Sequence, residues 1–206
     1  MASDHLLLRQ AVVSGSALVY WGGVLLHARR IRRKIGRTPN LRPKGPRETL
    51  LWTGWLIVIA VWIAQPWLVR GGSGSAPLSL IGGLLNPFTL AAGVVLIVVG
   101  YIATLRCYSV MGSAWRIGIS PQEKTTLITT GPFALIRHPL YAFQIVMLIG
   151  AFFLIPTVLS IAIFVLHFIC VLIKANAEES YLEKMYGEEY REYKARSGAL
   201  LPKMKS

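Results

Sequence analysis

Two groups of ionisable residues lie at the ends of one apolar region near the end of the sequence. The first, Arg-His-Pro-Leu-Tyr at 137–141, precedes an apolar run that continues to Leu154, and the second, Glu178-Glu179, follows the next apolar run. Only Pro156 separates the two runs, so we predict a helical hairpin that returns both groups to one membrane boundary. Ionisable groups held there can form a pocket for a polar ligand beside a reaction partner that arrives through the lipid.

The first group has the composition of a helix start that attracts anions. Pro139 suits the first turn of a helix, because its missing N–H is no loss there, and His138 then occupies the N-cap. The free N–H groups of that turn carry partial positive charge, and Arg137 adds a full charge with a planar set of donors. A carboxylate or a phosphate is the ligand for such a corner. Alternatively, these residues form an interfacial belt that binds nothing.

The second group shows a helical stripe. Lys174 and Glu178 are four residues apart and share a face, whereas Glu179 points about 100° away, so we expect only one glutamate to face a pocket squarely. His167 falls on the same stripe inside the last apolar run. An ionisable residue at that depth is either a functional group or a neutral His bonded to a neighbouring helix. The alternative for the whole segment is an ordinary juxtamembrane helix with ion pairs.

The composition predicts an integral membrane protein that positions these groups. The 206 residues are 54% hydrophobic and 15% charged, with a mean hydropathy of +0.53, which is too apolar for a soluble domain of this size. We predict an all-α fold with five transmembrane helices in a single membrane domain, residues 1–206. The predicted spans are residues 6–28, 50–69, 88–111, 139–155 and 157–174, with the last two as a short hairpin and a cytoplasmic helical segment over 175–206. The loop before the fourth span and this C-terminal tail are predicted to form a cytoplasmic pocket.

The distribution of basic residues orients these spans. Nine Lys and Arg residues lie between the first two spans, whereas the connection 70–87 carries one. Short loops rich in Lys and Arg stay in the cytoplasm, so we predict the N-terminus outside the cell membrane, with the pocket and the C-terminus in the cytoplasm. The net charge of +13 is concentrated beside the spans without any nucleic-acid-binding motif. Anionic lipid therefore explains it better than nucleic acid.

Small residues in the apolar runs are predicted to serve packing. Cys107 and Cys170 have no second Cys or His at ligand spacing, so we predict packing roles for them and no metal site. Gly93, Gly100 and Cys107 form a row on the third predicted span, which lets another helix approach closely. We expect no cleaved signal peptide, because residues 1–10 lack a basic region and a small-residue cleavage site.

The order of several uncommon elements resembles one family of membrane enzymes. Gly-Pro-Phe at 131–133 is followed by the 137–141 segment, a short hairpin, Glu-Glu-x-x-Leu at 178–182, a tyrosine-rich stretch at 186–193 and Leu-Pro at 201–202. This order resembles the isoprenylcysteine carboxyl methyltransferases and their phospholipid methyltransferase relatives, over roughly the C-terminal half from Trp115 onward. The resemblance implies S-adenosylmethionine bound on the cytoplasmic side and a lipid-like or prenylcysteine-like acceptor taken from the bilayer.

The resemblance also implies particular site residues. The family's substrate contact is a basic residue, usually Arg, one turn before the glutamate. Here it is Lys174, which keeps the charge but lacks the bidentate fork. Arg137, Lys174 and Glu178 are the catalytic candidates. Cofactor contacts are implied at Thr125, Thr126, Leu127, Ile128, Phe133, His138, Pro139, Leu140, Tyr141, Glu178 and Glu179.

The chemistry of methyl transfer suits these residue types. Transfer from a sulfonium is an in-line displacement, so the protein mainly aligns donor and acceptor and excludes water. Tyr141 and Phe133 can favour the sulfonium, a glutamate can accept from ribose hydroxyls or the amino group, and Arg137 can take the methionine carboxylate. A carboxylate or thiolate acceptor is already nucleophilic, whereas an amine acceptor needs a base such as His167 or a glutamate.

Two other functional classes remain open. Membrane reductases of the sterol type have a similar C-terminal arrangement and use a nicotinamide dinucleotide, although they are generally longer and have more spans. A non-enzymatic membrane adaptor would use both groups only as interface anchors. Transport is disfavoured, because five short spans without repeat symmetry offer no site at the midplane.

Overall fold

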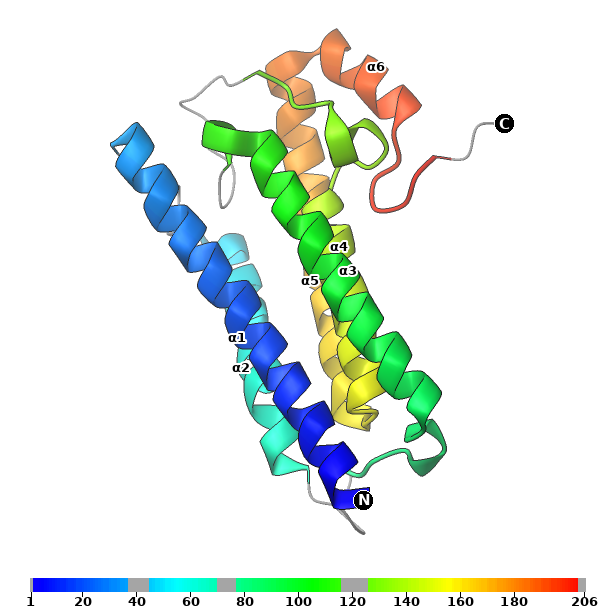
Figure 1. Ribbon diagram of the computed structural model, residues 1–206. Helices are drawn as coiled ribbons and strands as arrows, with labels where there is room; N and C mark the ends of the chain where they lie inside the picture. The colour runs from blue at the N-terminus through cyan, green and yellow to red at the C-terminus, as the bar shows by residue number, and fades with distance from the viewer. Residues whose placement is uncertain (1, 37–44, 70–76, 116–125, 204–206) are drawn as a thin grey trace.

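The computed structural model describes residues 2–36, 45–69, 77–115 and 126–203, which form a bundle of helices (Figure 1). Within these ranges there are six α-helices, three short 3-10 turns and no strand. The helices are α1 (Ala2–Ile35), α2 (Pro46–Leu68), α3 (Pro87–Met111), α4 (Pro139–Leu154), α5 (Val158–Tyr186) and α6 (Glu188–Arg196), and the turns are η1 (Gly82–Leu84), η2 (Gly112–Ala114) and η3 (Gly131–Ala134).

Four of the described helices, α1, α2, α3 and α5, are long and apolar enough to cross a membrane. The α4 helix is also apolar but has 16 residues, so it is about 24 Å long against a hydrocarbon core of about 30 Å. The prediction of an all-α integral membrane protein is therefore confirmed by four long apolar helices, with α4 as a shorter apolar helix packed among them.

The α3 and α4 helices pack closely through glycine, as the row of small residues predicted. An added Cβ at Gly93 would lie 2.7 Å from Leu154 Cγ, and one at Gly100 would lie 2.5 Å from Met147 Cγ. On the α4 side, a Cβ at Gly150 would lie 2.7 Å from the carbonyl oxygen of Gly93. The third predicted span therefore approaches α4 so closely that only glycine fits at these three positions.

Polar side chains fix the end of the bundle where α4 and α5 join. Arg9 is buried in α1 and donates to the carbonyl oxygens of Phe153 (3.0 Å) and Leu154 (3.2 Å), the last residues of α4. A cation suits this position, because the final carbonyls of a helix carry partial negative charge. On α2, Gln65 Nε2 donates to Ser160 Oγ of α5 at 2.8 Å. These bonds hold α1 and α2 against the hairpin.

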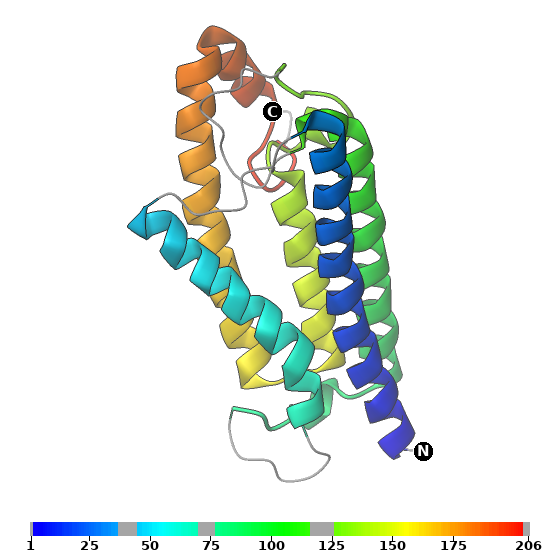
Figure 2. The ribbon, with the colours of Figure 1, turned by 90° about the vertical axis from the view of Figure 1, so that its left-hand side faces the viewer.

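The candidate site lies at the opposite end of the bundle. The ends of α1, α3 and α5 and the start of α4 lie toward this end, where α6 covers part of it (Figures 1 and 2). The start of α2 lies nearer the middle of α5, beside Ile173 and Lys174. The last turn of α1 there carries three basic residues, Arg32, Arg33 and Lys34. The two ionisable groups that the sequence placed at one boundary therefore do lie at the same end of the molecule.

Candidate functional site

The backbone just before α4 is held by the segment that follows α6. The N–H of Arg137 donates to the carbonyl of Gly198 at 2.8 Å, and the N–H of His138 donates to that of Ala199 at 3.0 Å. In return, the N–H of Gly198 donates to the carbonyl of Leu135 at 3.0 Å. These bonds satisfy the backbone of an irregular segment and fix the direction in which the Arg137 and His138 side chains leave it.

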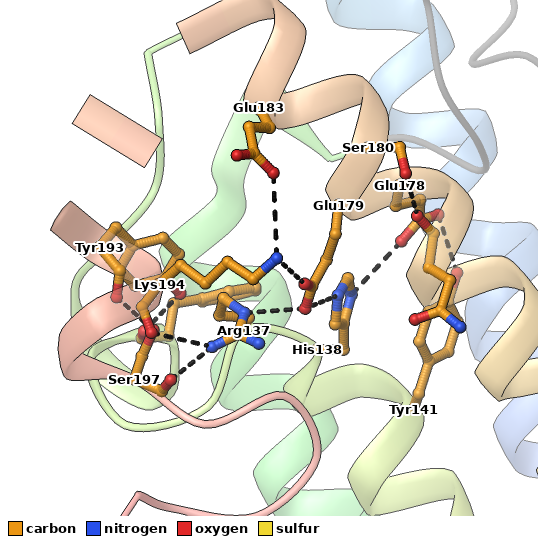
Figure 3. Close-up of polar contacts among 12 residues, drawn as sticks. Arg137, His138, Tyr141, Glu178, Glu179, Ser180, Glu183, Tyr193, Lys194 and Ser197 are labelled. Atoms are coloured by element: carbon orange, nitrogen blue, oxygen red, sulfur yellow. Dashed lines mark hydrogen bonds and ion pairs between the residues drawn. The ribbon is translucent and has the colours of Figure 1, made fainter. Parts of the chain in front are cut away.

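His138 lies between the two glutamates (Figure 3). Its Nδ1 is 3.4 Å from Glu178 Oε2, and its Nε2 is 3.4 Å from Glu179 Oε1. Although helical spacing turns the two carboxylates apart, the imidazole presents one nitrogen to each of them. Glu178 also accepts a hydrogen bond from the Tyr141 hydroxyl at 2.9 Å. Two segments about forty residues apart thus share one compact polar cluster.

Glu179 is bound by two further cations. Arg137 Nε donates to its Oε1 at 2.8 Å, and Lys194 Nζ of α6 lies 3.1 Å from its Oε2. The Arg137 guanidinium also donates to the main-chain carbonyl of Ser197. Arg137 is therefore engaged by a carboxylate and the backbone after α6, so it joins α4, α5 and α6 at one point.

The surroundings of His138 raise the pKa of its imidazole above the usual value of 6.5. Burial alone lowers the pKa of this group, because it disfavours the charged form. The neighbouring carboxylates of Glu178 and Glu179 act in the opposite direction, and together they outweigh burial. The geometry therefore favours a protonated imidazole held between two acids.

An aromatic column extends from the cluster to α2. The Tyr141 ring stacks with the His138 ring, with centroids 5.8 Å apart, and with the Trp55 ring, with centroids 6.2 Å apart. Trp55 comes from α2, outside the half of the chain that carries the recognisable motifs. Sequence reasoning missed it because a tryptophan within an apolar run shows no sign of which residue it meets.

The turn η3 is tied to α6. The Tyr193 hydroxyl donates to the carbonyl oxygen of Phe133 at 2.6 Å, and Ser197 Oγ donates to the Tyr193 carbonyl at 2.6 Å. Phe133 itself is buried. At the start of η3, Gly131 has a φ of 59°, which favours glycine. The tyrosine-rich stretch therefore positions the Gly-Pro-Phe turn next to the cluster.

Lys174 and His167 lie on the same helix as the glutamates but do not join the cluster. Lys174 Nζ is 3.7 Å from Glu48 Oε1 of α2, so it pairs across to α2 rather than along α5 with Glu178. His167 is 2% exposed, and neither ring nitrogen has a hydrogen-bond partner among the described residues. It lies eleven residues before Glu178, about 16 Å along the helix axis, which is too far to act as a base beside that glutamate.

The other candidate residues lie in the first turn of α4 and in the segment before η3. Pro139 and Leu140 form the first turn of α4, with His138 at the N-cap as predicted. Thr126, Leu127 and Ile128 lie in an irregular segment before η3, and Thr125 lies outside the described residues. In the described part of the chain, no group of three or more His, Cys, Asp or Glu side chains could hold a metal ion. Cys107 and Cys170 are both buried, as predicted.

Two curated proteins are similar to this chain. A nickel-cobalt-cadmium resistance protein, NccN, of Alcaligenes xylosoxydans xylosoxydans is 30% identical over 95 residues, which cover 46% of this chain and 45% of that protein. A methanethiol S-methyltransferase of Pseudomonas deceptionensis is 26% identical over 157 residues, which cover 73% of this chain and 56% of that protein. The chain thus spans about half the length of the curated relatives that it matches.

A family model matches a continuous half of the chain. The family is described as phospholipid methyltransferase, and the match covers residues 88–189. This segment runs from the start of α3 into the start of α6 and includes Arg137, His138, Tyr141, Glu178 and Glu179. Through this segment, which carries the motifs and most of the cluster that they form, the chain belongs to the phospholipid methyltransferase family.

Proposed function

We propose that this protein is an S-adenosylmethionine-dependent methyltransferase that acts on a lipophilic acceptor drawn from the bilayer. The main support for this proposal is the geometry of the His138 cluster. The Arg-His-Pro-x-Tyr and Glu-Glu segments, both within the matched family segment, converge on a single imidazole, with contacts of 3.4 Å to each glutamate. Such a cluster at the end of a bundle of apolar helices provides polar contacts for a cofactor beside a route for an apolar acceptor.

The chemistry of the cluster fits this cofactor. S-adenosylmethionine supplies a methyl group activated by a sulfonium. Glu178 and Glu179 offer carboxylate oxygens to an amino group and to hydroxyls, and the Tyr141 and Phe133 rings can face a cation. His138 lies between the two carboxylates and holds them in place, with Nε2 3.4 Å from Glu179 Oε1. Thr125, Thr126, Leu127, Ile128, Pro139 and Leu140 complete the proposed cofactor contacts.

The sequence suggested that Arg137 contacts the methionine carboxylate directly. We propose a different role for it. Its guanidinium is occupied by Glu179 and by the Ser197 carbonyl. We therefore assign Arg137 to positioning Glu179 and the segment after α6. Glu178, whose contacts among the described residues are His138 and Tyr141, is the glutamate with more freedom to contact a ligand.

A thiol is the acceptor that the similarity to the methanethiol S-methyltransferase favours. In this reaction the acceptor sulfur forms a new bond to the methyl carbon, the bond from the sulfonium to that carbon breaks, and the thiol proton leaves to water. Lys174, one turn before Glu178, adds positive charge that favours a thiolate, although its partner Glu48 reduces this effect. No side chain need act as a strong base for such an acceptor.

We also propose a topology for this enzyme. The domain comprises residues 1–206 and five spans, with α4 as the fourth, because this apolar helix lies among the long apolar helices and ends beside the start of α5 (Figure 2). The basic last turn of α1 lies at the same end as the cluster, which supports a cytoplasmic site and C-terminal segment and an N-terminus outside. A short α4 spans by local thinning of the bilayer.

Calorimetry on the detergent-purified protein tests the proposal. We expect micromolar binding of S-adenosylmethionine and of its demethylated product, and at least tenfold weaker binding after Glu178→Gln. Binding of a reduced nicotinamide dinucleotide alone would instead indicate a reductase. If no cofactor binds and the Glu178→Gln variant retains cellular function, the protein is an adaptor and the proposal is wrong.

A further inference from the structure

A pocket of about 310 Å³ lies on α5 on a flank different from the one that carries the His138 cluster. Helical spacing gives Ala177, Ser180, Tyr181 and Lys184 one common face of α5, turned away from Glu179. Arg47, in the first turn of α2, lines the pocket from the other side. Its lining residues are Arg47, Asn176, Ala177, Ser180, Tyr181 and Lys184.

The pocket is positively charged. Arg47 and Lys184 contribute two cations, and no carboxylate lines the pocket among the described residues. Arg47 also lies at the first turn of α2, whose N-cap Gly45 provides no side-chain cap. The free N–H groups of that turn add partial positive charge at the same place.

The acidic side chains near the pocket bind partners outside its lining. Glu178 binds Tyr141 and His138 on one side of α5, and Glu179 binds Arg137 and Lys194. The carboxylate of Glu183 is 3.9 Å from Lys194, and that of Glu48 is 3.7 Å from Lys174. These four acids therefore have cationic or hydroxyl partners outside the pocket lining, and the charges of Arg47 and Lys184 remain available to an anion.

The depth of the pocket favours an amphiphile over a soluble anion. Arg47 donates to the carbonyl of Ile173, the last apolar residue before Lys174, so the pocket begins where the apolar part of α5 ends. Below it, Leu50 and Ile57 of α2 and Ile169 of α5 are strongly exposed, at 71%, 47% and 48%. Basic side chains at the membrane surface above exposed apolar side chains match a lipid with an anionic head and acyl chains.

We propose that this pocket binds the phosphate headgroup of an anionic phospholipid, which is a bound lipid and not the methyl acceptor. Arg47 and Lys184 pair with the phosphate, and the Asn176 amide in the same lining hydrogen-bonds to the glycerol part of the head. The Ser180 hydroxyl donates to the Asn176 carbonyl at 2.9 Å, so it can accept a bond from a glycerol hydroxyl. Such a lipid joins the start of α2 to the end of α5. The site is separate from the His138 cluster, so it does not depend on the methyltransferase activity.

Native mass spectrometry of the detergent-purified protein tests this site. The probes are phosphatidylglycerol and phosphatidylcholine with identical acyl chains. We expect the wild-type protein to retain phosphatidylglycerol at least tenfold more tightly than phosphatidylcholine. In the double variant Arg47→Gln with Lys184→Gln, that preference should fall to about twofold or less. Equal retention of the two lipids by the wild-type protein would overturn the proposal.

A matched variant controls for general electrostatics. Arg32→Gln with Lys34→Gln removes the same charge from the end of α1, outside the pocket lining, and should keep the preference. If it loses the preference equally, the pocket is not the site. If inorganic phosphate alone binds as tightly as the lipid, the ligand is a soluble anion and the proposal is also wrong. The single variant Lys184→Gln, at an exposed position, serves if the double variant unfolds.

Discussion

His138 is the residue on which the candidate site depends, because both glutamates contact it and its backbone N–H is bound to the segment after α6. The motifs identified His138, Tyr141 and the Glu pair by type and order. They could not show that Arg137 is engaged by Glu179 and the backbone, since a side chain's partners depend on helices brought together only by folding.

The two glutamates should respond differently to removal of their charge. Glu179→Gln leaves Arg137 and Lys194 without their shared carboxylate, and we expect a loss of about 1.5–3 kcal/mol in the free energy of unfolding. Glu178→Gln keeps an acceptor for the Tyr141 hydroxyl, so its stability should change by less than about 1 kcal/mol while cofactor affinity falls. Denaturant unfolding in detergent together with calorimetry measures both quantities, and equal stability losses would contradict this division.

The stability of the cluster should depend on pH through His138. Its pKa is raised in the folded state, so the protonated imidazole stabilises folding fully below pH 6.5, and this contribution is lost as pH rises through the raised pKa. The groups that face the ring are Glu178, Glu179 and Tyr141. We expect the melting temperature to fall between pH 6 and pH 9, with a smaller fall in His138→Gln. An identical fall in the variant would refute this origin.

At the scale of the elements, hydropathy located the helices, and the spans predicted at 88–111 and 139–155 agree with α3 and α4 to within one residue at each end, whereas α1 and α5 extend well beyond their predicted spans. The span predicted at 6–28 lies inside α1, which extends over Ala2–Ile35. The span predicted at 157–174 begins at the N-cap of α5 and ends well before that helix does, at Tyr186. Hydropathy marks the part of a helix suited to lipid, whereas a helix satisfies its own backbone and can continue into water. Trp55 was missed for a related reason, because the contact between α2 and α4 depends on how the helices cross.

The glycine contact between α3 and α4 gives a test at this scale. Gly100→Ala would place a Cβ 2.5 Å from Met147 Cγ and 2.9 Å from the Phe143 carbonyl oxygen, so we expect a loss of about 1–3 kcal/mol from overpacking. Gly22→Ala is the control, because nothing lies within 4 Å of its added Cβ. There, helix propensity should increase stability by up to about 1 kcal/mol. Similar melting temperatures for the two variants would contradict the packing argument.

At the scale of the whole molecule, the all-α membrane architecture was predictable because it follows from composition and the lengths of apolar runs. The gathering of the cluster at one end was predictable as well, since a hairpin returns its two ends to the same boundary. The C-terminal tail was predicted to help form the pocket, but the contacts of α6 were not, because a short charged helix gives no sign of where it docks. Its residue Lys194 binds Glu179, and the carbonyl of Ser197, directly after the helix, binds Arg137.

The proposed orientation predicts which positions face the outside of the cell. A cysteine introduced at exposed Gly83 in η1 should react with a membrane-impermeant maleimide on intact cells. One introduced at exposed Glu189 in α6 should react only after the membrane is permeabilised. The native Cys107 and Cys170 are buried and provide a low background. Labelling of both introduced cysteines on intact cells would contradict the orientation.

The backbone bonds from Arg137 and His138 to Gly198 and Ala199 also constrain when the site can form during biosynthesis. Synthesis proceeds at about 5–20 residues per second, so residues 137–138 enter the membrane region several seconds before their partners at 198–199 have been made. Nascent chains that end before residue 198 contain every residue of the two motifs, yet the backbone of His138 lacks its partner at Ala199. We therefore expect ribosome-bound intermediates of this length to insert into the bilayer without acquiring a competent pocket.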